Sequence, residues 1–270
     1  MCLIAFSWAP DGAMPLLLLA NRDEYYARES APAGWWEDQP DIWAGRDLRA
    51  GGTWLGVTKS GRFAALTNFR TGQAPKDDAR SRGALVYGFL STSISPQAYA
   101  EAVMAQADDY NGFNLVVGEI YGAGARAPSI WYCGNQQGAE ARELPPGLYG
   151  LSNAVLDTPW PKLTRLKAHV AGVGQTREDL VEACLAILSD TSIADDGDLP
   201  DTGVSAEMER MLSSVFIVGP LYGTRAQTVV RADASGVIEA TERGFDSEEQ
   251  ARLAEPPALR QVRWHVAQAR

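Results

Sequence analysis

Cys2 is the first residue of this chain whose position suggests chemistry. Residue 2 is small, so Met1 is expected to be removed, which would leave Cys2 with a free α-amino group beside its thiol. An α-amine has a reference pKa of about 7.7–8.0 and can act as the general base for the side chain of its own residue. The alternative is that Cys2 is a small buried hydrophobic residue of a strand.

A second group of candidates is the segment Asn21-Arg22-Asp23-Glu24, which directly follows an apolar run. Charged groups at the end of a buried run need partners, because their desolvation is costly. In a regular strand Asn21 and Asp23 face one way, whereas Arg22 and Glu24 face the other. One pair is therefore expected beside Cys2 while the other anchors the strand. The alternative is an internal salt bridge of Arg22 at a strand end.

Two asparagines and one arginine complete the set. Asn68 ends another apolar run, and Asn153 precedes a turn into a helical segment. Their side-chain NH₂ groups could stabilise a developing oxyanion, although asparagine is also common in turns. Arg225 precedes a late strand, where it could bind an anionic group bidentately or lie in a surface loop.

Cys2 and the segment from Asn21 to Glu24 are positioned by the first two expected strands, Cys2–Trp8 and Pro15–Ala20. A turn at Pro10-Asp11-Gly12 joins these strands. The second run is continuously apolar rather than alternating, which is typical of a strand buried on both faces. The sequence therefore places the start of the chain in a central strand.

The remaining pattern predicts a loop from Arg28 to Asp41, then strands, helices, strands, helices and strands. The expected strands are Gly51–Thr58, Arg62–Asn68, Asn114–Ile120, Ser129–Cys133, Gln227–Ala232 and Val237–Arg243, and the expected helices are Ser81–Leu90, Ser95–Ala107, Pro159–Ala171 and Thr176–Leu188. Lys59-Ser60-Gly61 is expected to join the first two of these strands in a hairpin, with Gly61 at a position that needs positive φ. Ser95 and Thr176 are expected to cap the helices that they begin. This order favours an α+β fold of antiparallel sheets with helices on their outer faces, formed by a single domain spanning residues 1–270.

Composition narrows the functional classes. The formal net charge of −10 argues against a nucleic-acid partner. Three cysteines without a C-x-x-C pair and two distant histidines predict no metal site. The apolar run Met14–Ala20 is too short for a membrane span, and no basic segment precedes it as in a signal peptide, so a cytoplasmic protein is expected.

Taken together, these motifs resemble the NRDE family, which includes the eukaryotic transport and Golgi organization 2 proteins. The matching segments are Met1-Cys2, Asn21 to Glu24, Trp43 to Asp47, Gly51 to Gly56, Leu66 to Arg70, Tyr149 to Asn153 and Tyr222 to Arg225. The resemblance implies the four-layer αββα sandwich of the N-terminal-nucleophile hydrolases, and cysteine amidases as the nearest enzymes. By the same resemblance Cys2 is the nucleophile, Arg22 and Asp23 orient it, Asn68 and Asn153 hold the oxyanion, and Arg225 is a second arginine of the site.

The expected function is therefore that of an N-terminal-nucleophile hydrolase-like protein acting on an amide or thioester of a small hydrophobic metabolite, with no required cofactor. The expected substrate-binding residues are Asn21, Glu24, Arg225 and Trp54. The alternative is a non-catalytic protein that binds and delivers haem, an acyl-CoA or another lipid, with the Cys2 thiolate as a ligand of haem iron. A purely structural polar cluster is the third interpretation.

Overall fold

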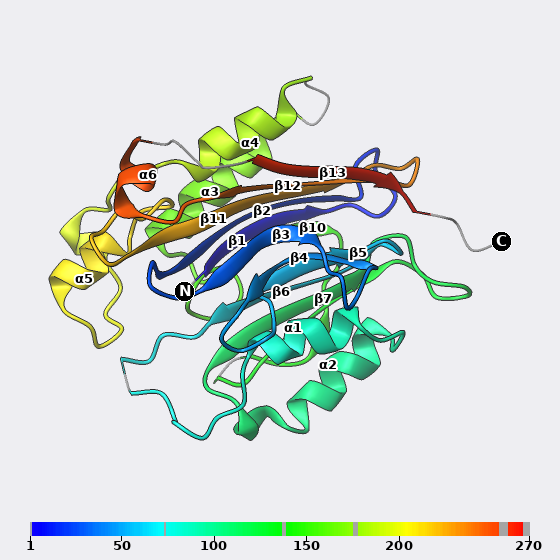
Figure 1. Cartoon of the computed structure of the whole chain (residues 1–270), viewed down its shortest axis with the longest axis horizontal. Helices are drawn as coiled ribbons and strands as arrows, with labels where there is room; N and C mark the ends of the chain where they lie inside the picture. Colours follow the sequence, from blue (N-terminus) through cyan, green and yellow to red (C-terminus); the bar gives the residue numbers. More distant parts are fainter. Residues whose placement is uncertain (1, 73, 137–138, 175–177, 254–258, 267–270) are drawn as a thin grey trace.

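Two antiparallel sheets stack face to face, and helices cover the outer face of each (Figure 1). The computed structural model describes residues 2–72, 74–136, 139–174, 178–253 and 259–266. From top to bottom, Figure 1 shows α3 and α4, the first sheet, the second sheet, and then α1 and α2. The predicted four-layer αββα sandwich is confirmed.

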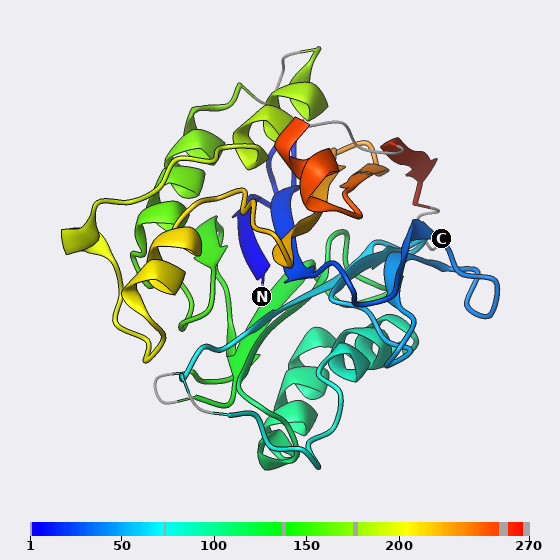
Figure 2. The ribbon, with the colours of Figure 1, turned by 60° about the vertical axis from the view of Figure 1, so that its left-hand side comes forward.

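The first sheet has six described strands in the order β10-β1-β2-β11-β12-β13. Their bounds are β10 Gly147–Leu151, β1 Cys2–Trp8, β2 Leu16–Tyr25, β11 Tyr222–Ala232, β12 Val237–Gly244 and β13 Leu259–His265. Because β1 pairs with β10 on one side and β2 on the other, the start of the chain lies inside the sheet, as predicted. In Figure 2 the beginning of β1 lies between the two halves of the sandwich.

The second sheet has seven described strands in sequence order, from β3 to β9. They are β3 Ser30–Trp35, β4 Ile42–Asp47, β5 Leu55–Thr58, β6 Arg62–Asn68, β7 Phe113–Glu119, β8 Ser129–Gly134 and β9 Arg142–Glu143. The predicted hairpin between β5 and β6 is present, and Gly61 in its turn has a φ of +81°, the left-handed conformation that favours glycine.

Helices α1 Gly83–Leu90 and α2 Pro96–Met104 cover the second sheet, whereas α3 Pro161–Gly172 and α4 Leu180–Leu188 cover the first. Two short helices, α5 Ala206–Met211 and α6 Glu248–Leu253, lie near the ends of the strands. The predicted cap of α2 is confirmed, because the Ser95 hydroxyl accepts a hydrogen bond from the amide of Ala98. The predicted cap at Thr176 lies outside the described residues.

Three apolar layers follow from this stacking. Even-numbered residues of β1, such as Ile4 and Phe6, enter the core between the sheets, whereas Leu3 and Ala5 pack under α3 and α4. A third core lies between the second sheet and helices α1 and α2. The first sheet is thus buried on both faces, which explains the continuous apolar run in β2.

The prediction of a loop from Arg28 to Asp41 is wrong for part of this segment, because Ser30–Trp35 forms β3. Pro32 and Gly34 disfavour a strand, but β3 is an edge strand whose pairing with β4 shifts register between Ala31 and Gly34. Edges and bulges are where sheets tolerate such residues. Among the described residues, no helix has the length and apolar character needed to cross a bilayer.

Candidate active site

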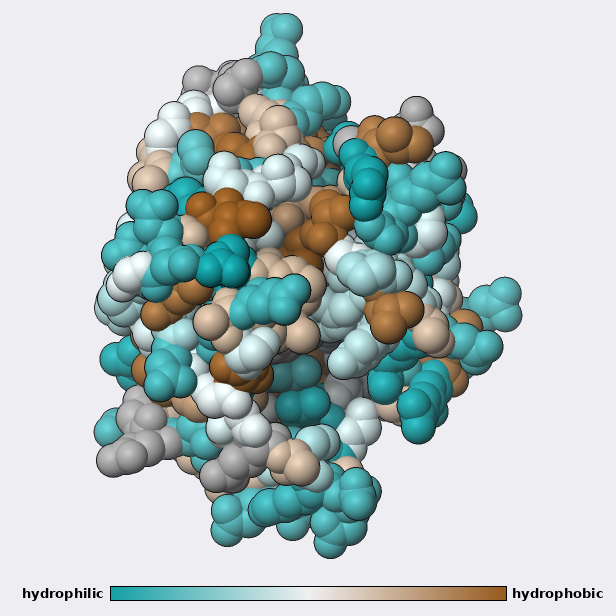
Figure 3. Space-filling model, turned by 90° about the vertical axis from the view of Figure 1, so that its left-hand side faces the viewer, coloured by the Kyte–Doolittle hydropathy of each residue, from teal (hydrophilic) through white to brown (hydrophobic). Residues whose placement is uncertain are grey.

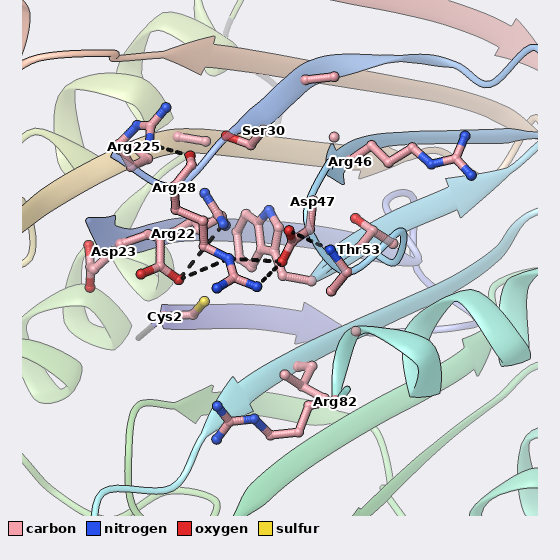
Figure 4. A pocket seen from close by; sticks show the side chains of 18 of the residues that line it. Cys2, Arg22, Asp23, Arg28, Ser30, Arg46, Asp47, Thr53, Arg82 and Arg225 are labelled. Atoms are coloured by element: carbon pink, nitrogen blue, oxygen red, sulfur yellow. Dashed lines mark hydrogen bonds and ion pairs between the residues drawn. The ribbon is translucent and has the colours of Figure 1, made fainter. Parts of the chain in front are cut away.

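Cys2 and Arg22 lie side by side at the ends of their strands. The two residues are opposite one another in the antiparallel pairing of β1 with β2, so their side chains project to the same face. That face also carries Ile4 and Phe6, which belong to the core between the sheets. Cys2 is 6% exposed and lies in the wall of a cavity, beside the Arg22 side chain (Figure 4).

Asn21 turns to the opposite face, as strand alternation requires. Its Nδ2 donates hydrogen bonds to the carbonyl oxygens of Leu188 and Val215 at 2.9 and 2.8 Å, and its side chain is fully buried. Those carbonyls lie at the end of α4 and in the segment that precedes β11. The structure therefore places Asn21 in an anchoring position, away from the thiol of Cys2.

Asp23 shares the face of Asn21 and belongs to a buried charged cluster behind Cys2. It accepts a hydrogen bond of 2.8 Å from the hydroxyl of Thr224, and burial raises the pKa of its carboxyl group. Lys162 of α3 opposes that rise and is only 2% exposed. Burial in turn lowers the pKa of Lys162 to about 8, and its Nζ has no hydrogen-bond partner among the described residues. Each group stabilises the charged form of the other.

The surroundings of Cys2 disfavour its thiolate. Burial raises the pKa of the thiol to about 11, the negative charge of Asp23 adds to this rise, and Arg22 opposes it. The thiol is therefore protonated at neutral pH, and a reaction that uses the thiolate needs a group to accept its proton.

Glu24 shares the face of Arg22 and begins a chain of opposite charges along the cavity wall. Its Oε2 lies 3.9 Å from Arg22 Nη2 and 4.0 Å from Arg28 Nε. Arg28 also contacts Asp47 of β4, at 2.6 Å between Nη2 and Oδ2. This chain links the second strand of the first sheet to an outer strand of the second sheet (Figure 4).

Arg225 occupies a β-bulge, where the pairing of β11 with β2 shifts register between Thr224 and Ala226. Its guanidinium donates to the carbonyl oxygens of Tyr25, Tyr26, Arg28 and Phe245 and to the carboxylate of Asp246. Although Arg225 lines the cavity, these bonds use its donors to hold chain segments together.

The two asparagines are neighbours with different surroundings. Asn68 lies in the cavity wall, whereas Asn153 is fully buried and donates through Nδ2 to the carbonyl oxygen of Asn68 at 2.8 Å. The side chain of Asn153 thus positions the end of β6. Trp54, also in the wall, is 9% exposed and packs into the core between the sheets.

Arg82 and Glu242 are among the wall residues that were not predicted from the sequence. Arg82 directly precedes α1 and donates through Nη1 to the carbonyl oxygen of Gly112 at 3.1 Å. Glu242 of β12 is 4% exposed, and its Oε1 accepts a hydrogen bond of 2.6 Å from the amide of Ala33 in the other sheet. Burial raises the pKa of Glu242 to about 7, opposed by that bond and by Arg22. In the sequence, Glu242 alternates with Ile238 and Ala240, which indicates that its carboxyl group lies on the buried face of the strand. This alternation was the signal that could have identified Glu242.

The cavity itself has a volume of about 550 Å³, and both charged and apolar residues line it. The apolar residues of its described wall are Ala31, Pro32, Ala50, Trp54, Leu66, Ala79 and Ala226. Cys2 is the one described wall residue of a type that ligates haem iron. Among the described residues, no group of three or more histidine, cysteine, aspartate or glutamate side chains is placed to hold a metal ion. Figure 3 shows the face at this end of the molecule, which is largely hydrophilic with separate hydrophobic patches.

Comparison with known proteins places the chain in one family. The profile of the Transport and Golgi organisation 2 family matches residues 1–247. The "Transport and Golgi organization protein 2 homolog" of Bos taurus is 37% identical over 264 residues, and that of Homo sapiens is 37% identical over 260 residues. Each alignment covers 91% of this chain and 93% of the relative.

Solved structures were also compared. A Caenorhabditis elegans N-acylethanolamine-hydrolyzing acid amidase ortholog aligns with a TM-score of 0.45 and 13% identity, over 70% of this chain and 86% of its own. A variant of conjugated bile acid hydrolase from Clostridium perfringens aligns with a TM-score of 0.43 and 10% identity, over 97% and 92%. On the family profile and the relatives of similar length, the chain belongs to the Transport and Golgi organisation 2 family.

Proposed function

We propose that the protein is a hydrolase that uses Cys2 as its nucleophile on an amide or thioester. The observation that carries the proposal is the placement of Cys2 at the start of an internal strand, in the wall of a cavity and opposite Arg22. A small apolar thiol needs no polar cavity around it, so a purely structural role leaves the surrounding arginines and carboxylates unexplained.

In the proposed reaction the Cys2 sulfur attacks the substrate carbonyl carbon. The thiol proton passes to a base and then to the leaving amine or thiol as the carbon–nitrogen or carbon–sulfur bond breaks. Water then hydrolyses the thioester to release the acid and restore the thiol. The α-amine of Cys2 is the proposed base if Met1 is removed, and Asn68 is the proposed oxyanion donor from the cavity wall.

The raised pKa of Cys2 gives a reason to retain a second candidate, a binding protein without turnover. A protonated thiol is a weak nucleophile, and the arginines of the cavity suit an acyl-CoA or another anionic lipid better than they suit haem. In this candidate Arg22 pairs with the acidic group of the ligand.

Intact mass and a Cys2→Ala variant separate these candidates. We expect the mass of the purified protein to lack one methionine, and we expect amide or thioester hydrolysis that Cys2→Ala abolishes while ligand affinity is retained. Retention of Met1 would remove the α-amine mechanism. Acyl-CoA binding by both forms without hydrolysis by either would favour the binding protein, and a haem spectrum lost in Cys2→Ala would favour thiolate ligation.

A further inference from the structure

The charge of the cavity is opposite to that of the molecule. The chain carries a formal net charge of −10, yet arginines outnumber carboxylates among the described residues of the cavity wall. The arginines are Arg22, Arg28, Arg46, Arg80, Arg82, Arg225 and Arg260, and the carboxylates are Asp23, Glu24, Asp47, Glu242 and Asp246. A local excess of positive charge in an acidic protein indicates a ligand that is itself anionic.

Most of these arginines are engaged by the protein. Arg46 forms a bidentate pair with Asp38, with both distances at 2.7 Å, and Arg28 contacts Asp47 at 2.6 Å. Arg225 is bound to backbone carbonyls, and Arg80 is exposed and contacts Gln106 and Asp109. These side chains have protein partners that satisfy their charge or their donors.

Arg22 and Arg82 differ from them. Arg22 has an 11% exposed side chain, and its nearest described carboxylate oxygen lies 3.9 Å away, beyond hydrogen-bond distance. Burial lowers the pKa of Arg82, and its one hydrogen bond to a described residue is the bond to Gly112. A guanidinium carries five N–H donors, so both residues retain donors directed to no described acceptor.

The two arginines also lie on different sides of Cys2. Arg22 is opposite Cys2 in the first sheet, whereas Arg82 approaches from the segment before α1, which covers the second sheet. Figure 4 shows Arg22 and Arg82 on either side of the thiol. The electrostatic interaction of each arginine with the thiol agrees with this proximity.

We propose that the acyl part of the substrate carries a carboxylate or phosphate next to the reacting carbon, and that Arg22 and Arg82 hold this anion from opposite sides of Cys2. This inference rests on the proposed hydrolase function and specifies its substrate class. It replaces the hydrophobic metabolite expected from the sequence with a small anionic acyl compound, which fits the arginines of the cavity wall.

Alkylation of Cys2 tests the anion site without turnover. Iodoacetate and iodoacetamide have nearly equal size and both form a carbon–sulfur bond to the thiolate with loss of iodide, but only iodoacetate is anionic. The measured quantity is the second-order rate constant for iodoacetate divided by that for iodoacetamide, with both reactions followed by intact mass. This ratio is then divided by the same ratio for glutathione. Because the thiolate fraction affects both reagents equally, the ratio does not depend on the pKa of Cys2.

We expect the normalised ratio of the wild type to be about tenfold higher than 1. A tenfold increase corresponds to about 1.4 kcal/mol of added attraction between the arginines and iodoacetate. Arg22→Gln and Arg82→Gln are each expected to lower it several-fold. Arg46→Gln is the matched control, since it removes an arginine of the same wall that is paired with Asp38. Cys2→Ala identifies the reacting thiol, because Cys133 and Cys184 are fully buried.

A wild-type ratio of 1, or a ratio unaltered in both folded arginine variants, would overturn the anion site. If Arg82→Gln does not fold, the salt dependence of the wild-type ratio decides: a fall toward 1 between low and high salt supports the site, and a constant ratio overturns it. Hydrolysis of neutral amides with a ratio of 1 would retain the hydrolase and remove this substrate class. A high ratio in a protein that hydrolyses nothing would support the anion site and exclude the proposed hydrolase function.

Discussion

The thiol of Cys2 and the carboxyl group of Asp23 project to opposite faces of the first sheet, yet the negative charge of Asp23 raises the pKa of the thiol. Little solvent separates two groups at the buried end of one strand pair, so their charges are weakly screened. Asp23 and Lys162 form the charged layer behind the thiol, whereas Arg22 and Arg82 form the layer in front of it. The reactivity of Cys2 depends on the balance between these two layers.

Replacement of Asp23 by asparagine is expected to lower the pKa of Cys2 from about 11 by about 1, because a buried negative charge near the thiol is removed. The pH dependence of iodoacetamide alkylation measures this pKa. The control is Asp246→Asn, a wall carboxylate whose side chain is 69% exposed, and it is expected to leave the alkylation profile unchanged. An alkylation midpoint that stays constant in Asp23→Asn would contradict the electrostatic account of the thiol.

Glu242 gives a prediction for stability. Its pKa rises from an ordinary value of 4.5 to about 7 on folding, so between these values the native state binds more protons than the unfolded state. The free energy of unfolding must then fall as pH rises through this window, by about 3 kcal/mol in total. The loss of stability is complete above pH 7. Below pH 4.5 the protonated side chain of Glu242 makes its full contribution to the free energy of unfolding.

Glu242→Gln is therefore expected to unfold at higher urea concentration than the wild type at pH 8 and at a similar concentration near pH 4.5. Glutamine cannot ionise and still offers an oxygen to the amide of Ala33. Glu239→Gln is the control, because it removes the partner of Arg231 and should lose stability at pH 8. Equal pH dependence of unfolding in Glu242→Gln and the wild type would exclude the buried acid as its cause.

At the scale of elements, the side chains from Asn21 to Glu24 alternate between the two faces of β2, so the segment has two different sets of contacts. One face of β2 presents Arg22 and Glu24 to the cavity. The other carries Asn21, which bonds to the end of α4, and Asp23, which also reaches the cavity wall. The alternation was predictable from the sequence. The assignment of each face was not, because it depends on which sheet covers the strand.

Asn21→Ala should test the anchoring face. It removes two buried hydrogen bonds and leaves the carbonyls of Leu188 and Val215 unpaired, which should lower the free energy of unfolding by about 2–4 kcal/mol. Asn111→Ala, which removes two exposed bonds with the backbone of Lys76, should cost less than about 1 kcal/mol. Urea unfolding measures both, and Asn21→Ala should keep the wild-type alkylation ratio at Cys2. A changed ratio without lost stability would instead place Asn21 among the ligand contacts.

The elements also show which features of the fold could be predicted from the sequence. The continuous apolar run of β2, the Gly61 hairpin and the capped helix α2 follow from local rules, and all three are confirmed. β3 was missed because Pro32 and Gly34 argue against a strand wherever the sheet edge is unknown. Arg82 and Glu242 were missed because they are far from Cys2 along the chain and only the stacking of the sheets brings them to its cavity.

At the scale of the whole molecule, the sheets share one core. Phe6 and Leu18 of the first sheet and Phe63 and Val116 of the second belong to the same apolar cluster. The cavity is built from both sheets as well, since Glu242 binds the amide of Ala33 across the layer. Neither sheet can separate without exposing this core and opening the cavity, so the predicted single domain should unfold as one unit.

Native-state hydrogen exchange with Phe6→Leu tests this coupling. Phe6 is fully buried in the shared core, and the substitution should lower the free energy of global unfolding by about 1 kcal/mol. If the molecule opens as one unit, the slowest amides of β2 and of β6 should lose the same protection, although β6 belongs to the other sheet. Leu48→Ala, a substitution at a 58% exposed residue, should alter neither. Loss of protection in β2 with unchanged β6 would show two units of independent stability, and the cavity between them would then open without unfolding either sheet.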